Sequence, residues 1–333
     1  MVEFEDLAGM TPTVASQLRK KDVTTVARLA KLNFESLQHL LHGVSYKTIR
    51  DIQQQSWEAT GGWFTPGSAL VEQKKSQLVF PTGCKSLDGL LGGGVRSNSI
   101  TEFAGDYGSG KTECLLTLLV ETLGRNKDYG ALFFDSEETF SEIRVIEIAE
   151  SRGYDTEGML GRFTMLKVRT SDQYKVGVEK ADQTIKEKNV KLFLIDSVIA
   201  PLRAEYVGRE TLPDRQGILN QILHEVRFYA TIYNLAVAVT NQVVANPNVV
   251  WNMDPVQMNV PTGGHILGHG AETRVYLRKA RGNHRIARLI DSSWLPPGEC
   301  VFKITKKGIE EASEEEKKGE EKEKKGEQEN GGN

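Results

Sequence analysis

The chain lacks the features that would place it in a membrane or in a disulfide-stabilised class of proteins. No apolar run approaches the ~20 residues of a membrane-spanning helix. The acidic start, Met-Val-Glu-Phe-Glu-Asp, does not have the basic and then apolar order of a signal peptide. The three cysteines, Cys84, Cys114 and Cys300, are far apart, which argues against a zinc knuckle or a disulfide framework. We therefore expect a cytoplasmic protein without a membrane partner, whose cysteines are packing residues.

Strong basicity is also missing. The formal charge is −3 over 333 residues, and residues 310–333 alone hold ten Glu and five Lys, which leaves the rest of the chain at +2. A nearly neutral body does not have the charge of a typical nucleic-acid-binding domain. Any contact with DNA must therefore come from local loops.

Residues 105–112 form a complete G-x-x-x-x-G-K-[ST] phosphate-binding loop between an apolar strand at 100–104 and an amphipathic helix at 113–123. Its glycines let backbone amides and the helix N-terminus approach a polyphosphate. Lys111 would reach the β- and γ-phosphates, and Thr112 would hold Mg²⁺. The alternative is a glycine-rich turn that only closes a strand. The expected nucleotide-binding residues are Gly105, Asp106, Tyr107, Gly108, Ser109, Gly110, Lys111 and Thr112.

Strand and helix candidates alternate after residue 79, which predicts an α/β fold. The apolar runs at 130–135, 191–196, 235–241 and 273–279 are continuous and not alternating, so we expect mostly parallel strands that are buried on both faces. A helix from Asp214 carries a regular apolar face. The predicted core, 79–310, is thus a mostly parallel central sheet flanked by helices.

The segments outside this core have other compositions. Residues 1–60 predict a small all-α domain in which Leu7–Thr11 and Leu41–Ser45 each place a glycine turn between helical stretches. This repetition is typical of helix-hairpin-helix units that bind DNA, although Thr11 and Ser45 stand where a second glycine is usual and a plain helical bundle remains possible. Residues 61–78 are interpreted as a linker, and residues 311–333 as a disordered acidic tail.

Two apolar strands end in acidic residues. Asp196 fits a carboxylate that orients the Mg²⁺ shell together with Thr112, and Glu137 fits a general base one water from the γ-phosphate. Each could instead be a helix N-cap or a solvated strand end.

Several segments together resemble the RecA superfamily. The first are residues 81–95 (PTGCKSLDGLLGGGV) and the strand and phosphate loop that follow. Other segments resemble its archaeal RadA branch, which is close to the eukaryotic strand-exchange recombinases: 203–210 (RAEYVGRE), 240–244 (TNQVV), 263–265 (GGH) and 281–291 (RGNHRIARLID). The resemblance spans roughly residues 1–310. It implies a RecA-like, DNA-dependent ATPase that forms filaments on single-stranded DNA and exchanges strands with homologous duplex in DNA repair.

The resemblance also implies residue roles. Glu137, Lys111 and Gln242 resemble the catalytic group, in which the glutamine senses the γ-phosphate, and Arg144 resembles the residue that lies against adenine. ATP would bind between subunits of a helical filament or ring, closed from the adjacent protomer by His269, Asp291 and Pro296.

Two segments are expected to contact DNA by the same resemblance. The first is about 203–215, with Arg203, Arg209 and Arg215 on phosphates and Tyr206 as an apolar or stacking contact. The second is about 243–264 and includes Gly263 and Gly264. From their residues alone both segments are ordinary surface loops, because the first also carries acids and the second has no basic residue.

The chain departs from the family pattern at two places. Glu138 stands where glycine is usual, and its charge could either repel the phosphates or point to solvent. The polymerisation motif contains Phe64 and Gly67, with glycine where alanine is commoner. The spacing of His265 and His269 could suit a metal on a helix, but no H-E-x-x-H motif supports a zinc site.

Three functions are compatible with these patterns. The first is a strand-exchange recombinase that uses ATP and Mg²⁺, with K⁺ as a further candidate ion, acts at the nucleoid and meets recombination mediators. The second is an accessory paralogue that binds ATP and DNA without exchanging strands. The third, a clock-type kinase, usually needs duplicated ATPase domains, whereas one phosphate loop is present.

Overall fold

A computed structural model describes residues 2–62, 64–246 and 258–313. The chain divides into two compact units. The first comprises residues 1–77 and 179–187, and the second comprises residues 78–178 and 188–333. Because part of one long helix groups with the first unit, the units are not simple halves of the sequence.

The first unit is helical. It contains η1 (Phe4–Asp6), α1 (Pro12–Arg19), α2 (Val26–Lys31), α3 (Phe34–Leu40), α4 (Tyr46–Ala59) and α5 (Gly67–Lys75). Its core is mostly aliphatic, with Leu18, Leu29, Leu37 and Ile52 fully buried beside Phe4. No strand occurs between residues 2 and 60 of the described chain, which agrees with the all-α prediction.

The two repeated glycine turns have the same local build. Gly9 and Gly43 both have positive φ angles, +90° and +75°. Two residues later, the hydroxyls of Thr11 and Ser45 accept hydrogen bonds from the first turn of α1 and α4. These residues are therefore helix N-caps, a role for which Thr and Ser are well suited. That the two turns form helix-hairpin-helix units remains a prediction.

The segment interpreted as a linker contains a regular helix. None of the residues of α5 is buried. Phe64, just before it, is 97% exposed. The turn-forming residues at 61–67 did not indicate this helix, which begins only after Pro66.

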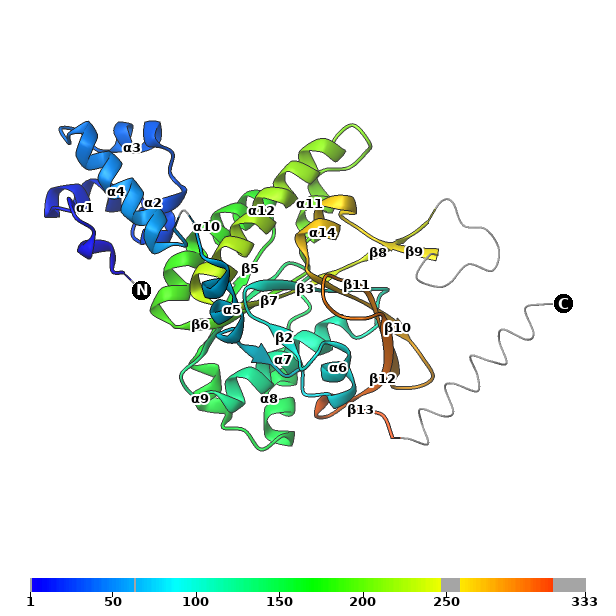
Figure 1. The fold of residues 1–333 in the computed structure, drawn as a ribbon. Helices are drawn as coiled ribbons and strands as arrows, with labels where there is room; N and C mark the ends of the chain where they lie inside the picture. Colours follow the sequence, from blue (N-terminus) through cyan, green and yellow to red (C-terminus); the bar gives the residue numbers. More distant parts are fainter. Residues whose placement is uncertain (1, 63, 247–257, 314–333) are drawn as a thin grey trace. The chain divides into compact units, whose positions relative to one another are not determined.

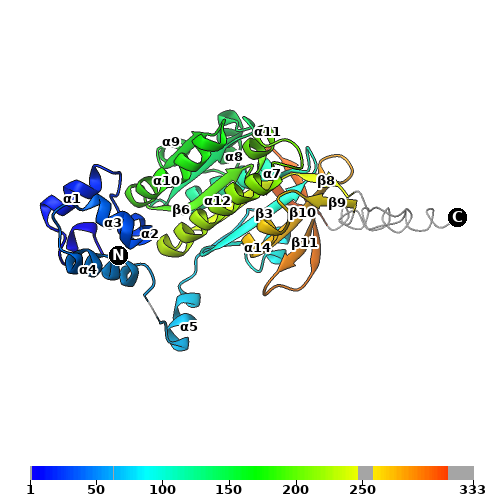
Figure 2. The same ribbon diagram turned by 90° about the horizontal axis from the view of Figure 1, so that it is seen from above.

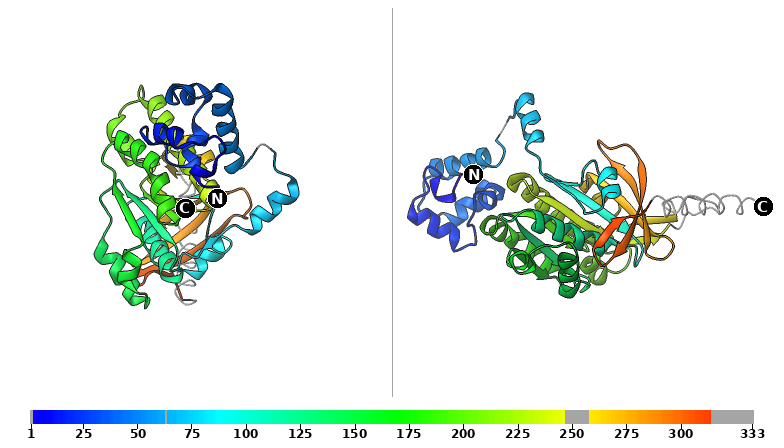
Figure 3. Two further views of the ribbon diagram at one scale, coloured as in Figure 1. Left: turned by 90° about the vertical axis from the view of Figure 1, so that its left-hand side faces the viewer. Right: turned by 90° about the horizontal axis from the view of Figure 1, so that it is seen from below.

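The second unit is built on a sheet of nine strands in the order β13-β12-β11-β10-β3-β7-β6-β4-β5. The six strands from β10 to β5 are parallel to one another, and β11, β12 and β13 continue the sheet in antiparallel pairing (Figure 3). The strands are β3 (Ser99–Gly105), β4 (Gly130–Asp135), β5 (Phe163–Lys167), β6 (Val190–Asp196), β7 (Ala236–Asn241), β10 (Thr273–Lys279), β11 (His284–Ser292), β12 (Gly298–Thr305) and β13 (Gly308–Glu311).

Two small sheets accompany it. One pairs β1 (Val79–Phe80) with β2 (Val95–Arg96), and the other pairs β8 (Val243–Ala245) with β9 (Asn259–Pro261). The second expected DNA segment, 243–264, therefore begins and ends in an antiparallel hairpin, and its residues 247–257 lie outside the described part.

Helices cover both faces of the large sheet (Figures 1 and 2). The helix α12 packs on β3 and β7 and against α11 and α14, whereas α7 packs on the opposite face with α8 and α9. The helices are α6 (Lys85–Leu90), α7 (Lys111–Arg125), α8 (Glu142–Ser151), α9 (Thr156–Leu160), α10 (Ser171–Glu187), α11 (Ala200–Glu205), α12 (Leu212–Tyr233) and α14 (Gly264–Gly270).

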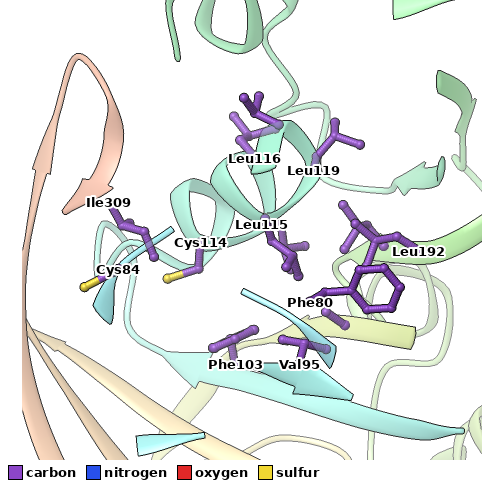
Figure 4. Packing of buried hydrophobic residues seen from close by; sticks show 14 of the residues in the cluster. Phe80, Cys84, Val95, Phe103, Cys114, Leu115, Leu116, Leu119, Leu192 and Ile309 are labelled. Atoms are coloured by element: carbon purple, nitrogen blue, oxygen red, sulfur yellow. The ribbon is translucent and has the colours of Figure 1, made fainter. Parts of the chain in front are cut away.

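The core beneath α7 explains why the phosphate loop has a firm support. Cys114 and Leu115 of α7 are buried above Phe103 of β3, and Leu192 of β6 lies in the same cluster (Figure 4). Each fully buried side chain of this size stabilises the fold by roughly 1.5–3 kcal/mol. The helix that follows the loop is thus fixed along its whole length.

The sequence predicted this architecture well. Every strand run named from the sequence forms a strand with the same bounds to within one residue, and the helix expected from Asp214 begins at Leu212. The last strand ends at Glu311, and Ala312 is buried, so the packed chain continues past the expected end at 310. The remainder of the expected tail, 314–333, lies outside the described residues. Among the described helices, none combines the length and apolarity needed to cross a membrane.

Candidate nucleotide and DNA site

Parallel pairing brings the carboxyl ends of four strands to one edge of the sheet. Asp135 at the end of β4 pairs in register with Asp196 of β6, and Ala104 of β3 pairs with Asn241 of β7. Ligands in open α/β sheets bind at this edge. The phosphate loop, the two acidic strand ends and Gln242 consequently meet there.

The phosphate loop has a geometry that only glycine permits. A Cβ on Gly105 would lie 2.2 Å from the carbonyl oxygen of Leu277. Gly110 is the N-cap of α7 and has a φ of +98°. The amides at the start of this 15-residue helix therefore face the loop, where an anion is favoured. The hydroxyl of Ser109 is buried and has no hydrogen-bond partner among the described residues, so the loop offers an unused polar atom to a ligand.

Lys111 is held at the loop by backbone oxygens. Its Nζ donates to the carbonyls of Gly105 at 2.8 Å and Asp106 at 2.9 Å. Burial lowers the pKa of this lysine, and the nearby carboxylates of Glu137 and Asp196 oppose that shift. An ammonium group in such surroundings gains further stabilisation from an added phosphate charge.

Thr112 and Asp196 lie together as the sequence predicts. The Thr112 hydroxyl donates to the Asp196 carboxylate at 2.6 Å, and Thr240 donates to its other oxygen. Burial raises the pKa of Asp196, while these two hydrogen bonds lower it. One hydroxyl and one carboxylate suit Mg²⁺, which keeps several waters and binds mainly through phosphates. Within the described ranges, no cluster of three or more His, Cys, Asp or Glu side chains forms a separate metal cage.

Glu137 and Gln242 are in direct contact. Gln242 Nε2 donates to Glu137 Oε1 at 2.9 Å. The loop that carries Glu137 is shaped by Asp135, whose carboxylate accepts backbone hydrogen bonds from residues 137, 139 and 140. The arrangement holds the expected general base at a fixed place beside the phosphate loop.

Gln242 also joins this site to the first expected DNA segment. Its Oε1 accepts a hydrogen bond from Arg203 Nη1 at 2.7 Å, so that Glu137, Gln242 and Arg203 form one chain of hydrogen bonds. Arg203 lies on α11, four residues after Ile199, which is the N-cap of this helix. The sequence named all three residues but did not reveal that they touch.

Arg144 is fixed by acidic and backbone partners. Its guanidinium bonds to Glu113 at the start of α7, to Glu147, and to the carbonyl of Thr305. The Glu113 hydrogen bond raises the pKa of Arg144 further. Since Glu113 follows Thr112 directly, the guanidinium lies close to the end of the phosphate loop. Its contact with adenine remains a prediction.

Comparison with known proteins agrees with this geometry. The Rad51 family model matches residues 73–312. This chain belongs to the Rad51 family. It is also similar to the DNA repair and recombination protein RadA of Aeropyrum pernix, with 37% identity over 311 residues that cover 92% of this chain and 96% of that protein.

The groups expected to reach a neighbouring Rad51-family subunit are exposed. His269 is on α14, Asp291 is on β11, and Pro296 follows that strand. Their side chains are therefore accessible to a second copy of the chain. Their role in closing a neighbour's nucleotide remains a prediction.

The expected DNA contacts are more varied. Arg209 is exposed, whereas Arg203, Tyr206 and Arg215 are half-buried around the start of α12. Gly263 and Gly264 have φ angles of +89° and +57°, and they form the turn into α14. The structure thus gives the two glycines a conformational role next to their predicted one.

Sequence reasoning missed two cations beside the phosphate loop. Arg285 Nε donates to the carbonyl of Gly108 at 3.1 Å, and Lys279 lies so close that a Cβ on Gly108 would be 2.8 Å from its Nζ. Both belong to the β10–β11 hairpin, about 170 residues further along the chain. Arg285 lies in the 281–291 segment that carries the family resemblance, but only tertiary pairing shows that it and Lys279 reach the phosphate loop.

Glu138 is paired with an arginine at an exposed position. Its carboxylate forms an ion pair with Arg169 at 3.1 Å, and both side chains are more than half exposed. The residue has a φ of +54°, which explains why glycine suits this position. Of the two interpretations of this charge, the structure favours the solvent-facing one.

Replacing Glu138 with glycine tests this placement. We expect Glu138→Gly to change ATP turnover by less than about twofold, because an exposed ion pair contributes little. Turnover would be measured by phosphate release, with Glu137→Gln as the control that loses activity. A rise of more than about tenfold in Glu138→Gly, equivalent to about 1.4 kcal/mol, would show that the charge acts on the phosphates.

Proposed function

We propose that this chain is an ATP-dependent DNA recombinase. It hydrolyses ATP in a DNA-stimulated manner, forms filaments on single-stranded DNA, and pairs and exchanges strands with homologous duplex during DNA repair. The observation that carries the proposal is the hydrogen-bonded chain Glu137–Gln242–Arg203, which joins the nucleotide site to a residue of the first DNA segment. Membership of the Rad51 family and the similarity to a RadA protein support it.

Each residue of the nucleotide site has a role in hydrolysis. The N-terminus of α7 and Lys111 bind the phosphates, and Arg144 lies along the adenine. Glu137 accepts a proton from the attacking water, while Gln242 orients that carboxylate. Thr112 and Asp196 would hold Mg²⁺, which would supply positive charge beside the phosphate oxygens.

DNA binding affects the same groups. The Arg203 guanidinium donates to Gln242, and it is also the kind of cation that binds a DNA phosphate. When the Arg203 guanidinium binds a DNA phosphate, its hydrogen bond to Gln242 weakens. DNA contact therefore changes the position of Gln242 and, with it, the hydrogen bond from Gln242 to Glu137. Arg209, Arg215, Tyr206 and the turn at Gly263 and Gly264 supply the remaining contacts.

Self-association completes the ATP site. His269, Asp291 and Pro296 of one subunit close the nucleotide that is bound by the next, which ties ATP hydrolysis to the state of the filament. Phe64 provides the aromatic anchor between subunits, with Gly67 after it. K⁺ is a further candidate ion beside Mg²⁺, recombination mediators are candidate partners of the filament, and the nucleoid is the expected place of action.

Nothing observed favours the accessory-protein alternative over a recombinase. The helical N-terminal unit and every named nucleotide residue are present. The two functions differ in a single activity, which an experiment can separate.

Strand exchange is the assay that distinguishes them. The purified chain should transfer a labelled oligonucleotide into homologous duplex with ATP present, and single-stranded DNA should stimulate its phosphate release. Lys111→Ala should lower turnover by at least about 100-fold, because it removes a charged group from the transferring phosphates. DNA binding and stimulated turnover without exchange would instead identify an accessory protein.

The polymerisation contact can be tested separately. Phe64 is 97% exposed, so its burial by a neighbour would provide strong binding. Phe64→Ala should elute as a monomer in size-exclusion chromatography under conditions where the unaltered chain forms large assemblies. Ile143→Ala removes another apolar side chain, which is 80% exposed, and should leave the assemblies intact. Persistent assemblies in Phe64→Ala would contradict this role.

A further inference from the structure

Glu102 is a charged residue in the middle of the sheet. It lies in β3, three residues before the phosphate loop, and none of its surface is exposed. A carboxylate in such a place destabilises the fold unless it is paired and hydrogen-bonded. Its partners therefore indicate why the position is not apolar like the rest of the strand.

The two oxygens of Glu102 bind groups on the two neighbouring strands. Oε1 accepts a hydrogen bond from Asn241 Nδ2 on β7 at 2.7 Å, and Oε2 accepts one from Arg274 Nε on β10 at 2.5 Å. Arg274 is directly opposite Glu102 in the pairing of β3 with β10. The acid thus ties three adjacent parallel strands together on one face.

Asn241 continues this network to the β8–β9 hairpin. Its Nδ2 also donates to the carbonyl of Thr262 at 2.7 Å, and the Thr262 hydroxyl donates to Asn241 Oδ1 at 2.6 Å. The same hydroxyl lies 3.1 Å from the Gln242 carbonyl, which also accepts the Thr262 amide at 2.9 Å. The base of the hairpin is consequently closed on residues 241 and 242.

Residues 241 and 242 therefore have side chains that serve different purposes. The Asn241 amide is held from one side by Glu102 and from the other by Thr262. The Gln242 amide extends to Glu137 and Arg203. A movement of the hairpin base would displace the peptide between residues 241 and 242. This displacement reorients the Gln242 side chain only if Asn241 stays in place.

We propose that Glu102 is a positioning residue that anchors Asn241 to β3, so that movement at the base of the β8–β9 hairpin reaches Glu137 through Gln242. This inference rests on the proposed function, because it requires DNA to move the hairpin. Arg274, the other hydrogen-bond partner of Glu102, contacts the helix that follows the hairpin. Arg274 Nη1 lies 3.4 Å from where a Cβ on Gly268 would stand, so it packs against this helix, α14.

Thr262 provides the sharpest test, since it can be changed without altering the buried charge. Thr262→Val removes the hydroxyl and keeps the shape, whereas Thr262→Ser keeps the hydroxyl. The measured quantity is the ratio of ATP turnover with single-stranded DNA to turnover without it. We expect Thr262→Val to lower this ratio by about fivefold, which corresponds to the loss of one hydrogen bond, and Thr262→Ser to retain it.

Glu102→Gln tests the anchor itself. The substitution replaces one of the two accepting oxygens with an NH₂ group, so that either Asn241 Nδ2 or Arg274 Nε faces a donor and loses its hydrogen bond. The ratio should therefore fall at least as far as in Thr262→Val. The matched control is Glu272→Gln, because Glu272 is another acid of this region that accepts from Arg227 and the Ile100 amide and not from Asn241. This control should keep the ratio, and thermal unfolding would show that the variants compared are folded. If Glu102→Gln does not fold, the comparison of Thr262→Val with Thr262→Ser decides whether the inference holds.

The outcomes separate the inference from the proposed function. If the unaltered chain shows DNA-stimulated turnover and both Thr262→Val and Glu102→Gln retain the full ratio, the inference is wrong and the function stands. If the unaltered chain shows no stimulation at all, the proposed function and the inference fall together. A ratio lowered in Thr262→Val and in folded Glu102→Gln, but not in Thr262→Ser or Glu272→Gln, supports the anchor.

Discussion

The parallel pairing of β3, β4, β6 and β7 is the constraint on which the site depends. It places the phosphate loop, Asp135, Asp196 and Gln242 at one edge of the sheet, although they are up to about 137 residues apart in sequence. Packing of α7 on one face and α12 on the other keeps that edge fixed. The contacts of Asp196 with Thr112 and Thr240, and of Gln242 with Glu137, depend on this register.

Hydrogen bonds at this edge connect residues that lie in separate segments of the sequence and have different proposed roles. Glu137 is the proposed general base and Arg203 belongs to the first proposed DNA segment, and Gln242 is hydrogen-bonded to both. At the neighbouring position, Asn241 joins the second proposed DNA segment to the strand that leads into the phosphate loop. Two adjacent residues, Asn241 and Gln242, are thus hydrogen-bonded to both segments that are proposed to contact DNA. If that proposal holds, these bonds provide a physical basis for hydrolysis that depends on DNA.

Local patterns predicted the fold and the identity of most site residues, because glycine spacing, apolar runs and acidic strand ends are local properties. They could not predict contacts that arise from tertiary pairing. Arg285 and Lys279 reach the phosphate loop only through the β10–β11 hairpin. Glu102 did carry a signal, since an acid inside a buried strand needs partners, but its bonds to Asn241 and Arg274 depend on strand order. The ion pair that turns Glu138 to solvent likewise depends on where Arg169 lies.

The most direct test of the account is the response of a Gln242→Ala variant to single-stranded DNA. Its ATP turnover and its DNA binding would be measured together, with and without the DNA. If Gln242 carries the effect of DNA to Glu137, the variant binds the DNA but its turnover stays at the DNA-free rate. Stimulation as large as that of the unaltered chain would contradict the account.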